Sequence, residues 1–277
     1  MNSSSDIRKR IFLVGTARSG TTLLQSMLSA HPELFSLPET HFWRGTIPFQ
    51  ACKRLGKSFG AQERRFVTDF LERLQAGDLK TLLPGFTFSQ KRWTRALLRI
   101  LDQYTQRQGH RIWLEKTPMH LYYIDLIQAV DPSVYFVHNL RNGEDVVASL
   151  YDAGHKHPES FNTRSIPRCV RRWRREIAIS RRYIGQPQHA FVRYEALVEN
   201  PEAQLRSLCK CIELPFRNEM LDYRREADRL RFPEETWKER NSDQIRKVRK
   251  FDKLFSPDEQ EWIQSRVSQI DLGIFDI

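Results

Sequence analysis

The sequence predicts an α/β fold: a P-loop-like parallel β-sheet flanked by helices, with a helical cap over its active edge. A short apolar run, Ile11 to Val14, leads through a glycine-containing loop into a helical pattern from Thr21 to Ala30. Further β-rich runs alternate with helical patterns along the chain. Such alternation is typical of parallel pairing, with helices on both faces of the sheet and ligands at the carboxyl ends of the strands.

The remaining elements follow in order after the first strand and helix. β-rich runs predict three more strands, with the sequences RIWLE (111–115), VYFVHNL (134–140) and HAFVRY (189–194). Two long amphipathic stretches, about Glu63 to Leu74 and Gln90 to Gln106, separate the first of these runs from the N-terminal unit. We expect them to form the helical cap.

Length and composition predict one cytoplasmic domain over residues 1–277. No linker, repeat or low-complexity tract divides the chain, and its apolar runs are too short to span a bilayer. The first ten residues, MNSSSDIRKR, lack the long apolar region of a secretory signal. The cysteines fit neither a metal pattern nor a dense disulfide framework, which favours reduced thiols and predicts no metal site; they are Cys52, Cys169, Cys209 and Cys211.

The net charge of +11, with an isoelectric point near 9.7, indicates an anionic partner. The most basic stretch is RCVRRWRREIAISRR (168–182), but Val170, Trp173, Ile177 and Ile184 fall near one helical stripe. The arginines are then expected on a solvated helix face. A nucleic-acid binder stays open as an alternative that salt-dependent DNA binding would reveal, although no zinc-finger, RNP or homeodomain pattern supports it.

The loop GTARSGTT (15–22) resembles a nucleotide-binding P-loop that lacks its lysine. Gly15, Gly20 and Thr22 match the pattern G-x-x-x-x-G-K-[ST], whereas Thr21 stands where the lysine belongs. A purely structural turn between strand and helix, or a degenerate nucleotide loop, would produce the same glycine spacing. The missing lysine argues against a kinase or NTPase.

Anion binding does not require that lysine. Small residues bring the amides of Ser19 to Thr22 close to an anion at the positive end of a helix. Arg18 adds a forked, permanently charged donor for the oxygens of the anion.

Several segments together resemble one enzyme family. The segment VGTARSGTTLLQSMLSAHPELFSLPET (14–40) is similar to the 5′-phosphosulfate loop and following helix of sulfotransferases that use 3′-phosphoadenosine 5′-phosphosulfate (PAPS). The likeness is greatest to the tyrosylprotein and Golgi-type branch and its bacterial homologues. The segments WLEKTPMHL, LRNGEDVVASLY, VRYEALVENPEAQL and KERNSDQIRKVRK follow in the family's order. Residues 44–110 resemble the family least, and acceptor specificity is expected there.

The resemblance implies a donor site built from several strand ends. Its members are Arg18, Ser19, Gly20, Thr21 and Thr22 for the 5′-phosphosulfate, Arg141 and Ser149 for the 3′-phosphate, Tyr194 near the adenine, and Asn241 and Ser242 in the segment that closes over the donor. Arg141 and Ser149 are eight residues apart, which is close to two helical turns, so both can face one anion. Asn241 stands where the family commonly has serine.

The resemblance also implies the catalytic groups. Lys116 matches a lysine near the bridging oxygen of the donor, where it would stabilise the leaving group. Glu39 matches the glutamate that acts as general base in the tyrosylprotein branch. His41 and His120 are the competing bases, but the cytosolic branch places its histidine shortly after a K-T pair, where this chain has Pro118.

The predicted function is therefore sulfuryl transfer from PAPS to an acceptor hydroxyl, with Arg18, Lys116 and Glu39 in catalytic roles. The acceptor classes left open are a sugar, a lipid, a peptide tyrosine and a small molecule. A P-loop kinase or NTPase is the alternative, yet the available acidic residues, Asp125, Asp131 and Glu144, do not sit in a Walker-B context for Mg²⁺.

Overall fold

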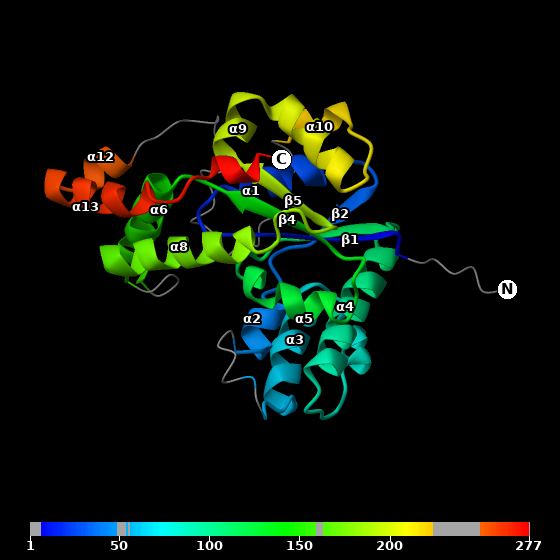
Figure 1. Cartoon of the computed structure of the whole chain (residues 1–277). Helices are drawn as coiled ribbons and strands as arrows, with labels where there is room; N and C mark the ends of the chain where they lie inside the picture. The colour runs from blue at the N-terminus through cyan, green and yellow to red at the C-terminus, as the bar shows by residue number, and fades with distance from the viewer. Residues whose placement is uncertain (1–6, 49–53, 55, 159–162, 224–249, 277) are drawn as a thin grey trace.

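A five-stranded, all-parallel sheet forms the centre of the molecule (Figure 1). The computed structural model describes residues 7–48, 54, 56–158, 163–223 and 250–276. The strand order is β2-β3-β1-β4-β5, and the strands are β1 (Lys9–Gly15), β2 (Leu34–Ser36), β3 (Ile112–Glu115), β4 (Tyr135–Leu140) and β5 (His189–Arg193). The predicted α/β fold is confirmed. β2 was not predicted, because three residues at a sheet edge carry too little pattern to be recognised.

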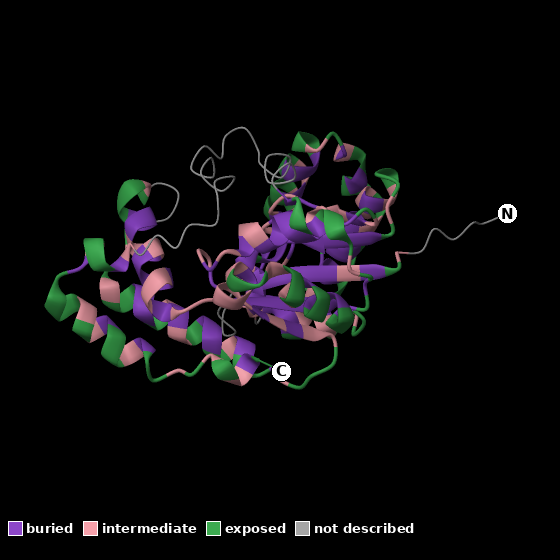
Figure 2. Cartoon of the chain, turned by 90° about the horizontal axis from the view of Figure 1, so that it is seen from above, coloured by how far each residue is buried: buried purple, intermediate pink, exposed green. Residues whose placement is uncertain are grey.

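The strands are covered on both faces, which explains their apolar composition. Every residue of β3 and β4 is buried, as expected for a parallel sheet between two helical layers. Figure 2 shows this burial running through the sheet. In register, Gly15 of β1 lies beside Asn139 of β4, and Leu140 lies beside Arg193 of β5. The carboxyl ends of these three strands therefore meet at one edge.

One face of the sheet packs against the helix that follows the glycine loop and against two later helices. Alternate β1 residues, Ile11 and Leu13, belong to this apolar cluster, because successive strand side chains point to opposite faces. The covering elements are α1 (Thr21–Ser29), α9 (Tyr194–Glu199), α10 (Pro201–Cys211) and the 3₁₀ helix η4 (Asn218–Leu221).

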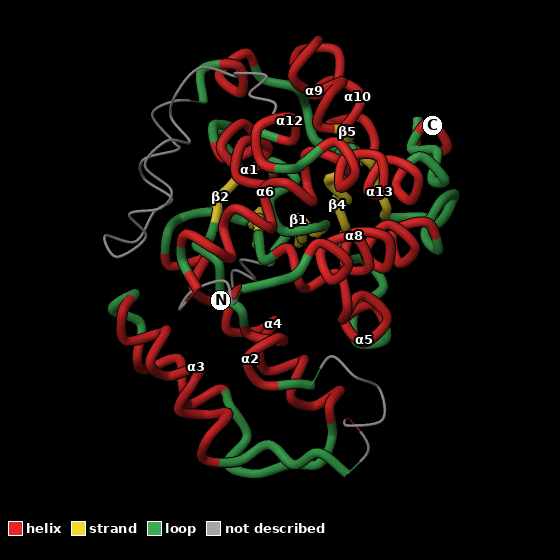
Figure 3. The backbone as a smooth tube through the Cα atoms, turned by 90° about the vertical axis from the view of Figure 1, so that its left-hand side faces the viewer, coloured by secondary structure: helices red, strands yellow, loops and turns green. Residues whose placement is uncertain are grey.

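The opposite face packs against the cap, which Figure 3 shows as a separate group of helices beside the sheet. The cap and its neighbours are α2 (Phe42–Thr46), α3 (Ala61–Arg73), η2 (Gly77–Leu82), α4 (Gln90–Arg107), η3 (Pro118–Tyr123) and α5 (Ile124–Gln128). Phe12 of β1 joins cap and sheet through edge-on contacts with Trp43 at 5.3 Å and Trp113 at 5.2 Å. Both predicted amphipathic stretches are helices, and α2 carries the cap to the active edge.

A third cluster extends from the carboxyl end of β4. It contains α6 (Gly143–Lys156), α8 (Ile166–Arg181), α12 (Phe251–Leu254), α13 (Pro257–Val267) and η6 (Gly273–Phe275). The predicted stripe of α8 is confirmed, since Val170, Trp173 and Ile177 are buried. Across residues 7–48, 54, 56–158, 163–223 and 250–276, no helix combines the length and apolar character needed to cross a membrane.

Candidate active site

The glycine loop is fixed against the end of β4. Gly15 has φ +147°, and a Cβ there would lie 2.4 Å from the carbonyl oxygen of Asn139, so only glycine allows this approach. The side chain of Asn139 donates to the carbonyl oxygen of Ser19 at 2.8 Å. The Ser19 hydroxyl donates back across the loop to the carbonyl oxygen of Thr16 at 2.6 Å. The loop backbone is therefore held in one shape by its neighbour strand.

The N-terminus of α1 is open toward the active edge. No side chain caps this helix, and the amides of Leu23 and Leu24 bond back to the carbonyl oxygen of Gly20. Within the described ranges, no acceptor reaches the amides of Gly20, Thr21 and Thr22. Unpaired amides at the positive end of a helix dipole form an anion-binding site. The geometry therefore leaves the amides that the sequence predicts for the donor available to an anion.

Arg18 connects the predicted donor residues to the catalytic edge. Its backbone is left-handed, with φ +73°, and its Nε donates to the Ser149 hydroxyl at 3.1 Å. Burial lowers the pKa of Arg18, an effect opposed by Asp152 and Glu39 and reinforced by Arg141. Arg18 thus lies within electrostatic reach of the residues predicted for both ends of the donor.

Arg141 occupies the turn between β4 and α6 and stacks on Tyr194. The guanidinium carbon lies 4.3 Å from the centre of the Tyr194 ring, and Nη2 donates to Asp145 at 2.9 Å. The Arg141 Nε atom is buried without a partner among the described residues. Tyr194 in turn covers Gly20, where a Cβ would lie 2.2 Å from its ring. The structure therefore places Arg141 and Tyr194 at the glycine loop.

Asp152 is a site residue that sequence reasoning missed. It lies on α6 near Arg18, and its carboxylate binds Lys156 at 2.9 Å and Lys250 at 2.6 Å. In the sequence, only its position could have indicated a role at the site. It lies close to one helical turn after Ser149, on the same helix. The predicted residues Asn241 and Ser242 lie outside the described residues.

A buried lysine and a carboxylate meet at the end of β3. Lys116 follows the strand, is only 2% exposed, and forms an ion pair with Glu39, which is 18% exposed. Glu39 arrives from the segment after β2. His41 lies beside it, with its Nε2 atom 3.6 Å from Glu39 Oε2. Burial lowers the pKa of His41, an effect that the neighbouring Glu39 opposes, and this favours the neutral imidazole.

Glu115 has a different environment from Glu39. Lys116 is its neighbour in the chain but forms its ion pair with Glu39. Glu115 is fully buried, and it accepts hydrogen bonds from the Thr40 amide and hydroxyl at 3.1 and 2.9 Å and from the Thr117 hydroxyl at 2.6 Å. Its Oε2 atom lies 2.8 Å from His120 Nδ1. Burial acts to raise the pKa of Glu115, but His120 and these donors outweigh it and lower the pKa.

This network separates the two candidate histidines. His120 is completely buried, bonded to Glu115 and packed edge-on against Trp43 at 5.0 Å. His41, in contrast, is partly exposed beside Glu39. Of the two histidines, the structure therefore brings only His41 to the Lys116–Glu39 pair, and His120 fixes the Glu115 carboxylate.

Arg172 and Arg44 lie within electrostatic reach of Arg164, and Arg44 also lies within reach of His41. Burial lowers the pKa of Arg164, and the neighbouring charges of Arg172 and Arg44 lower it further. Arg44 also acts on His41. Arg172 binds the buried Glu176 at 3.0 Å, whereas the Arg164 Nη1 atom is buried and has no partner in the described part of the chain.

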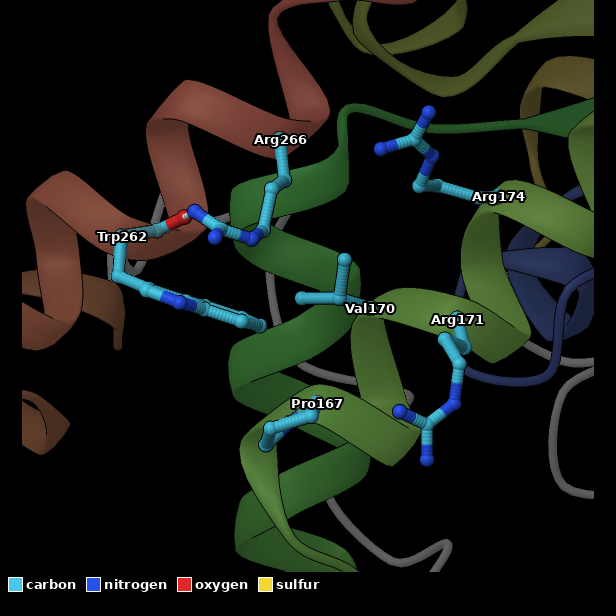
Figure 4. A pocket seen from close by; sticks show the side chains of 6 residues that line it. All are labelled: Pro167, Val170, Arg171, Arg174, Trp262 and Arg266. Carbon is cyan, nitrogen blue, oxygen red and sulfur yellow. Dashed lines mark hydrogen bonds between the residues drawn. The ribbon is translucent and has the colours of Figure 1, made fainter.

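A hollow of about 320 Å³ lies apart from this edge, between α8 and α13 (Figure 4). Its lining residues are Pro167, Val170, Arg171, Arg174, Trp262 and Arg266. On α8 these residues occupy the helix face opposite Arg172 and Glu176. The hollow is therefore not part of the candidate active site. The described residues contain no cluster of three or more His, Cys, Asp or Glu side chains suited to a metal ion.

Comparison with protein families gives one match that covers more than half of the chain. The model described as "Sulfotransferase family" matches residues 10–218. The chain is 25% identical over 238 residues to a protein-tyrosine sulfotransferase of Drosophila melanogaster, covering 85% of this chain and 44% of that protein. It is 27% identical over 227 residues to protein-tyrosine sulfotransferase 1 of Danio rerio, and this match covers 77% of this chain and 55% of that protein. The chain spans about half the length of these curated relatives.

Solved structures show the same fold at low sequence identity. The sulfotransferase domain of the Synechococcus PCC 7002 olefin synthase superposes with a TM-score of 0.61 at 21% identity, covering 98% of each chain. A mouse sulfotransferase complexed with PAP (3′-phosphoadenosine 5′-phosphate) gives a TM-score of 0.51 at 12% identity. That match covers 95% of this chain and 84% of the mouse chain.

Proposed function

Because the chain belongs to the sulfotransferase family, we propose that it transfers a sulfuryl group from PAPS to an acceptor hydroxyl. One observation carries the proposal: an anion-binding helix terminus and two arginines lie at the same sheet edge as a buried lysine–carboxylate pair. The PAP-bound mouse structure, which shares the fold, supports PAPS as the donor.

The residues of this edge fit the two anionic ends of such a donor. The open amides of Gly20, Thr21 and Thr22 suit the 5′-phosphosulfate, and Arg18 adds a charge-assisted donor beside them. Arg141 suits the 3′-phosphate, because its Nε atom is buried and unpartnered among the described residues. Burying a donor without an acceptor is costly, and a bound phosphate removes that cost.

The proposed reaction is an in-line displacement at sulfur. The acceptor oxygen forms a bond to sulfur while the bond from sulfur to the bridging oxygen breaks, and the electron pair of that bond stays on the phosphate of PAP. Glu39 takes the proton of the acceptor hydroxyl. Lys116 stabilises the charge that develops on the leaving oxygen. As in phosphoryl transfer, positioning and cationic stabilisation dominate the rate enhancement.

The pairing of Lys116 with Glu39 fits both proposed roles. An ammonium group at the carboxylate keeps two opposite charges together in a site where Lys116 is 2% exposed. Movement of Lys116 toward the leaving oxygen would free Glu39 to accept a proton. His41, whose Nε2 atom lies 3.6 Å from Glu39 Oε2 and whose pKa is lowered by burial, is the competing base.

The acceptor is proposed to carry a hydroxyl group and, beside it, negative charge. The curated relatives described above are named as protein-tyrosine sulfotransferases, which makes a peptide tyrosine the first acceptor to test, ahead of sugars, lipids and small alcohols. Arg44, which acts on His41, and Arg164, whose Nη1 atom is buried without a partner among the described residues, support an anionic acceptor, because opposite charges speed capture and favour binding.

The test is incubation of the protein with labelled PAPS and a panel of tyrosine peptides, oligosaccharides, lipids and small alcohols, followed by mass spectrometry. A sulfonate addition that Lys116→Met abolishes would support the proposal. If the protein transferred a phosphoryl group from ATP but no sulfuryl group from PAPS, the kinase alternative would replace this proposal.

A further inference from the structure

Two phenylalanines project into solvent from the loop between η2 and α4. Phe86 is 57% exposed and Phe88 is 66% exposed, and their rings meet edge to face at 5.0 Å. Among the described residues, the other strongly exposed large apolar side chains are Phe66 and Leu221, each at 38%. An adjacent exposed pair of this size indicates a binding surface.

The backbone beneath the two rings is fixed. Thr87, between them, is buried and exchanges two backbone hydrogen bonds with Phe59, at 2.8 and 3.0 Å. The Thr87 hydroxyl accepts from the Ser89 amide at 3.0 Å. Arg64 Nη1 donates to the carbonyl oxygen of Pro84 at 2.9 Å. Hydrogen bonds therefore fix the backbone of this loop, and the two rings are exposed although the loop itself is well ordered by these contacts.

A row of cations continues from the rings along the exposed side of α4. Its members are Lys91, Arg92, Arg95 and Arg99. In the part of the chain that the structure describes, none of them lies within ion-pair distance of a carboxylate. The pairs Lys91–Arg95 and Arg95–Arg99 are spaced i, i+4, where like charges destabilise a helix. This arrangement favours an anionic partner.

The exposed rings and the cations are neighbours in the chain, because the loop that carries Phe86 and Phe88 leads directly into α4 at Gln90. α4 begins beside the exposed loop and ends where the chain turns into β3, as Figure 1 shows. Eight residues separate Lys91 from Arg99, so the cations extend along about 12 Å of helix. We call this surface, made of Phe86, Phe88, Lys91, Arg92, Arg95 and Arg99, the α4 surface.

We infer that the α4 surface binds anionic lipid bilayers. Projecting rings enter a fluid interface without needing a preformed cavity, whereas a protein partner would have to supply matching hollows. Long cationic side chains beside them reach several lipid headgroups at once, and such a combination is typical of proteins that lie on a membrane without crossing it. The surface is separate from the Lys116–Glu39 pair and serves to hold the protein at a membrane.

The experiment measures sedimentation of the whole chain with phosphatidylcholine vesicles, with and without 30% phosphatidylserine. Wild type should bind the anionic vesicles at least ten-fold more tightly than the neutral ones, and added salt should weaken binding. Replacing Phe86 and Phe88 together by serine should weaken anionic-vesicle binding about ten-fold or more. Replacing Lys91, Arg92, Arg95 and Arg99 by glutamine should do the same.

Two matched controls distinguish binding by this surface from nonspecific hydrophobic binding and from an effect of net charge alone. Leu221→Ser removes an exposed apolar side chain elsewhere. Substituting four α8 arginines by glutamine removes the same charge from another helix; these are Arg168, Arg171, Arg174 and Arg175. Both controls should bind like wild type, and the thermal unfolding midpoint verifies folding of each variant.

Equal losses in the α8 variant, or wild-type binding by the double phenylalanine variant, would overturn the inference. A third arm uses a DNA duplex in place of vesicles. Tight DNA binding that needs the α4 cations but not the rings, without vesicle binding, would assign the surface to nucleic acid instead.

Discussion

The two walls of the candidate active site are built in different ways. The donor wall consists of the glycine loop, the start of α6 and Tyr194, and it presents backbone amides and the cations Arg18 and Arg141. The cap wall consists of residues 39–41 and 115–120, and side chains from separate segments meet there around Glu115. A continuous motif encodes the glycine loop of the first wall, whereas long-range packing brings Arg141 and Tyr194 to that loop and assembles the second wall.

The difference is clearest in the two carboxylates of the cap wall. Glu115 accepts three hydrogen bonds in addition to its contact with His120 and is fully buried. Glu39 is partly exposed and faces Lys116 and His41. We therefore expect Glu115 to serve stability and Glu39 to serve turnover, and substitutions can separate these roles.

The largest expected effect is on turnover in Glu39→Gln. The amide keeps the size of the side chain but does not take a proton, so turnover with PAPS should fall by roughly 10²–10⁴-fold. Donor affinity, measured on the same preparation by calorimetry with PAP, should hardly change.

His41→Asn is the matched control for this variant, since it removes the other titratable group beside Glu39. It should retain most of the turnover. Near-normal turnover in Glu39→Gln together with a collapse in His41→Asn would move the base to the histidine.

Glu115→Ala should produce the largest loss of stability. It leaves His120 and the hydroxyls of Thr40 and Thr117 buried without their shared acceptor, and breaking a buried pair in this way costs about 3–5 kcal/mol of unfolding free energy. Urea denaturation measures the loss. Glu39→Gln is the comparison and should cost less, because its amide oxygen can still accept a hydrogen bond from the buried Lys116; equal losses would remove the distinction between the two carboxylates.

Arg141→Ala should weaken the donor wall without unfolding it. Loss of a charge-assisted bond, worth about 1.5–3 kcal/mol, lowers the affinity for PAP by about ten-fold or more. Arg206→Ala serves as the control, because the exposed Arg206 forms its ion pair with Glu202 within α10. An unchanged PAP affinity in folded Arg141→Ala would exclude this arginine from the donor site.

A further effect concerns the sheet beneath both walls and appears in the pH dependence of stability. Burial lowers the pKa of His138 well below its usual value and that of His189 to about 4. Between pH 6.5 and 4 the unfolded chain binds protons that the folded chain does not, so stability is retained above pH 6.5 and falls as the pH decreases. His189→Gln should flatten this fall by less than about 1.4 kcal/mol per pH unit. Urea midpoints across this range test it, and an unchanged slope would contradict the buried neutral state of His189.

The sequence predicts local features of the site better than contacts between distant segments. The strand, loop and helix around Gly15 and Gly20 were predicted because backbone geometry there depends on adjacent residues. The contact of Asp152 with Lys250 was not predicted. It depends on where α6 lies relative to a residue that is distant in the chain.

The Glu115 network illustrates the limit most directly. Its partner His120 lies five residues away and was considered a candidate base, and only the burial of both side chains reveals a structural pair. The domain boundaries, the cytoplasmic location and the roles of Asn241 and Ser242 stay predictions.

The most direct test of the central claim, a donor site for a 3′-phosphorylated nucleotide at the glycine loop, is thermal unfolding with matched nucleotides. PAP, AMP, and ATP with Mg²⁺ are compared at equal concentration, since a ligand that binds only the folded state raises the unfolding temperature. PAP should give the largest increase, and Arg141→Ala should reduce it toward that of AMP. A larger increase with ATP and Mg²⁺ than with PAP would contradict the account.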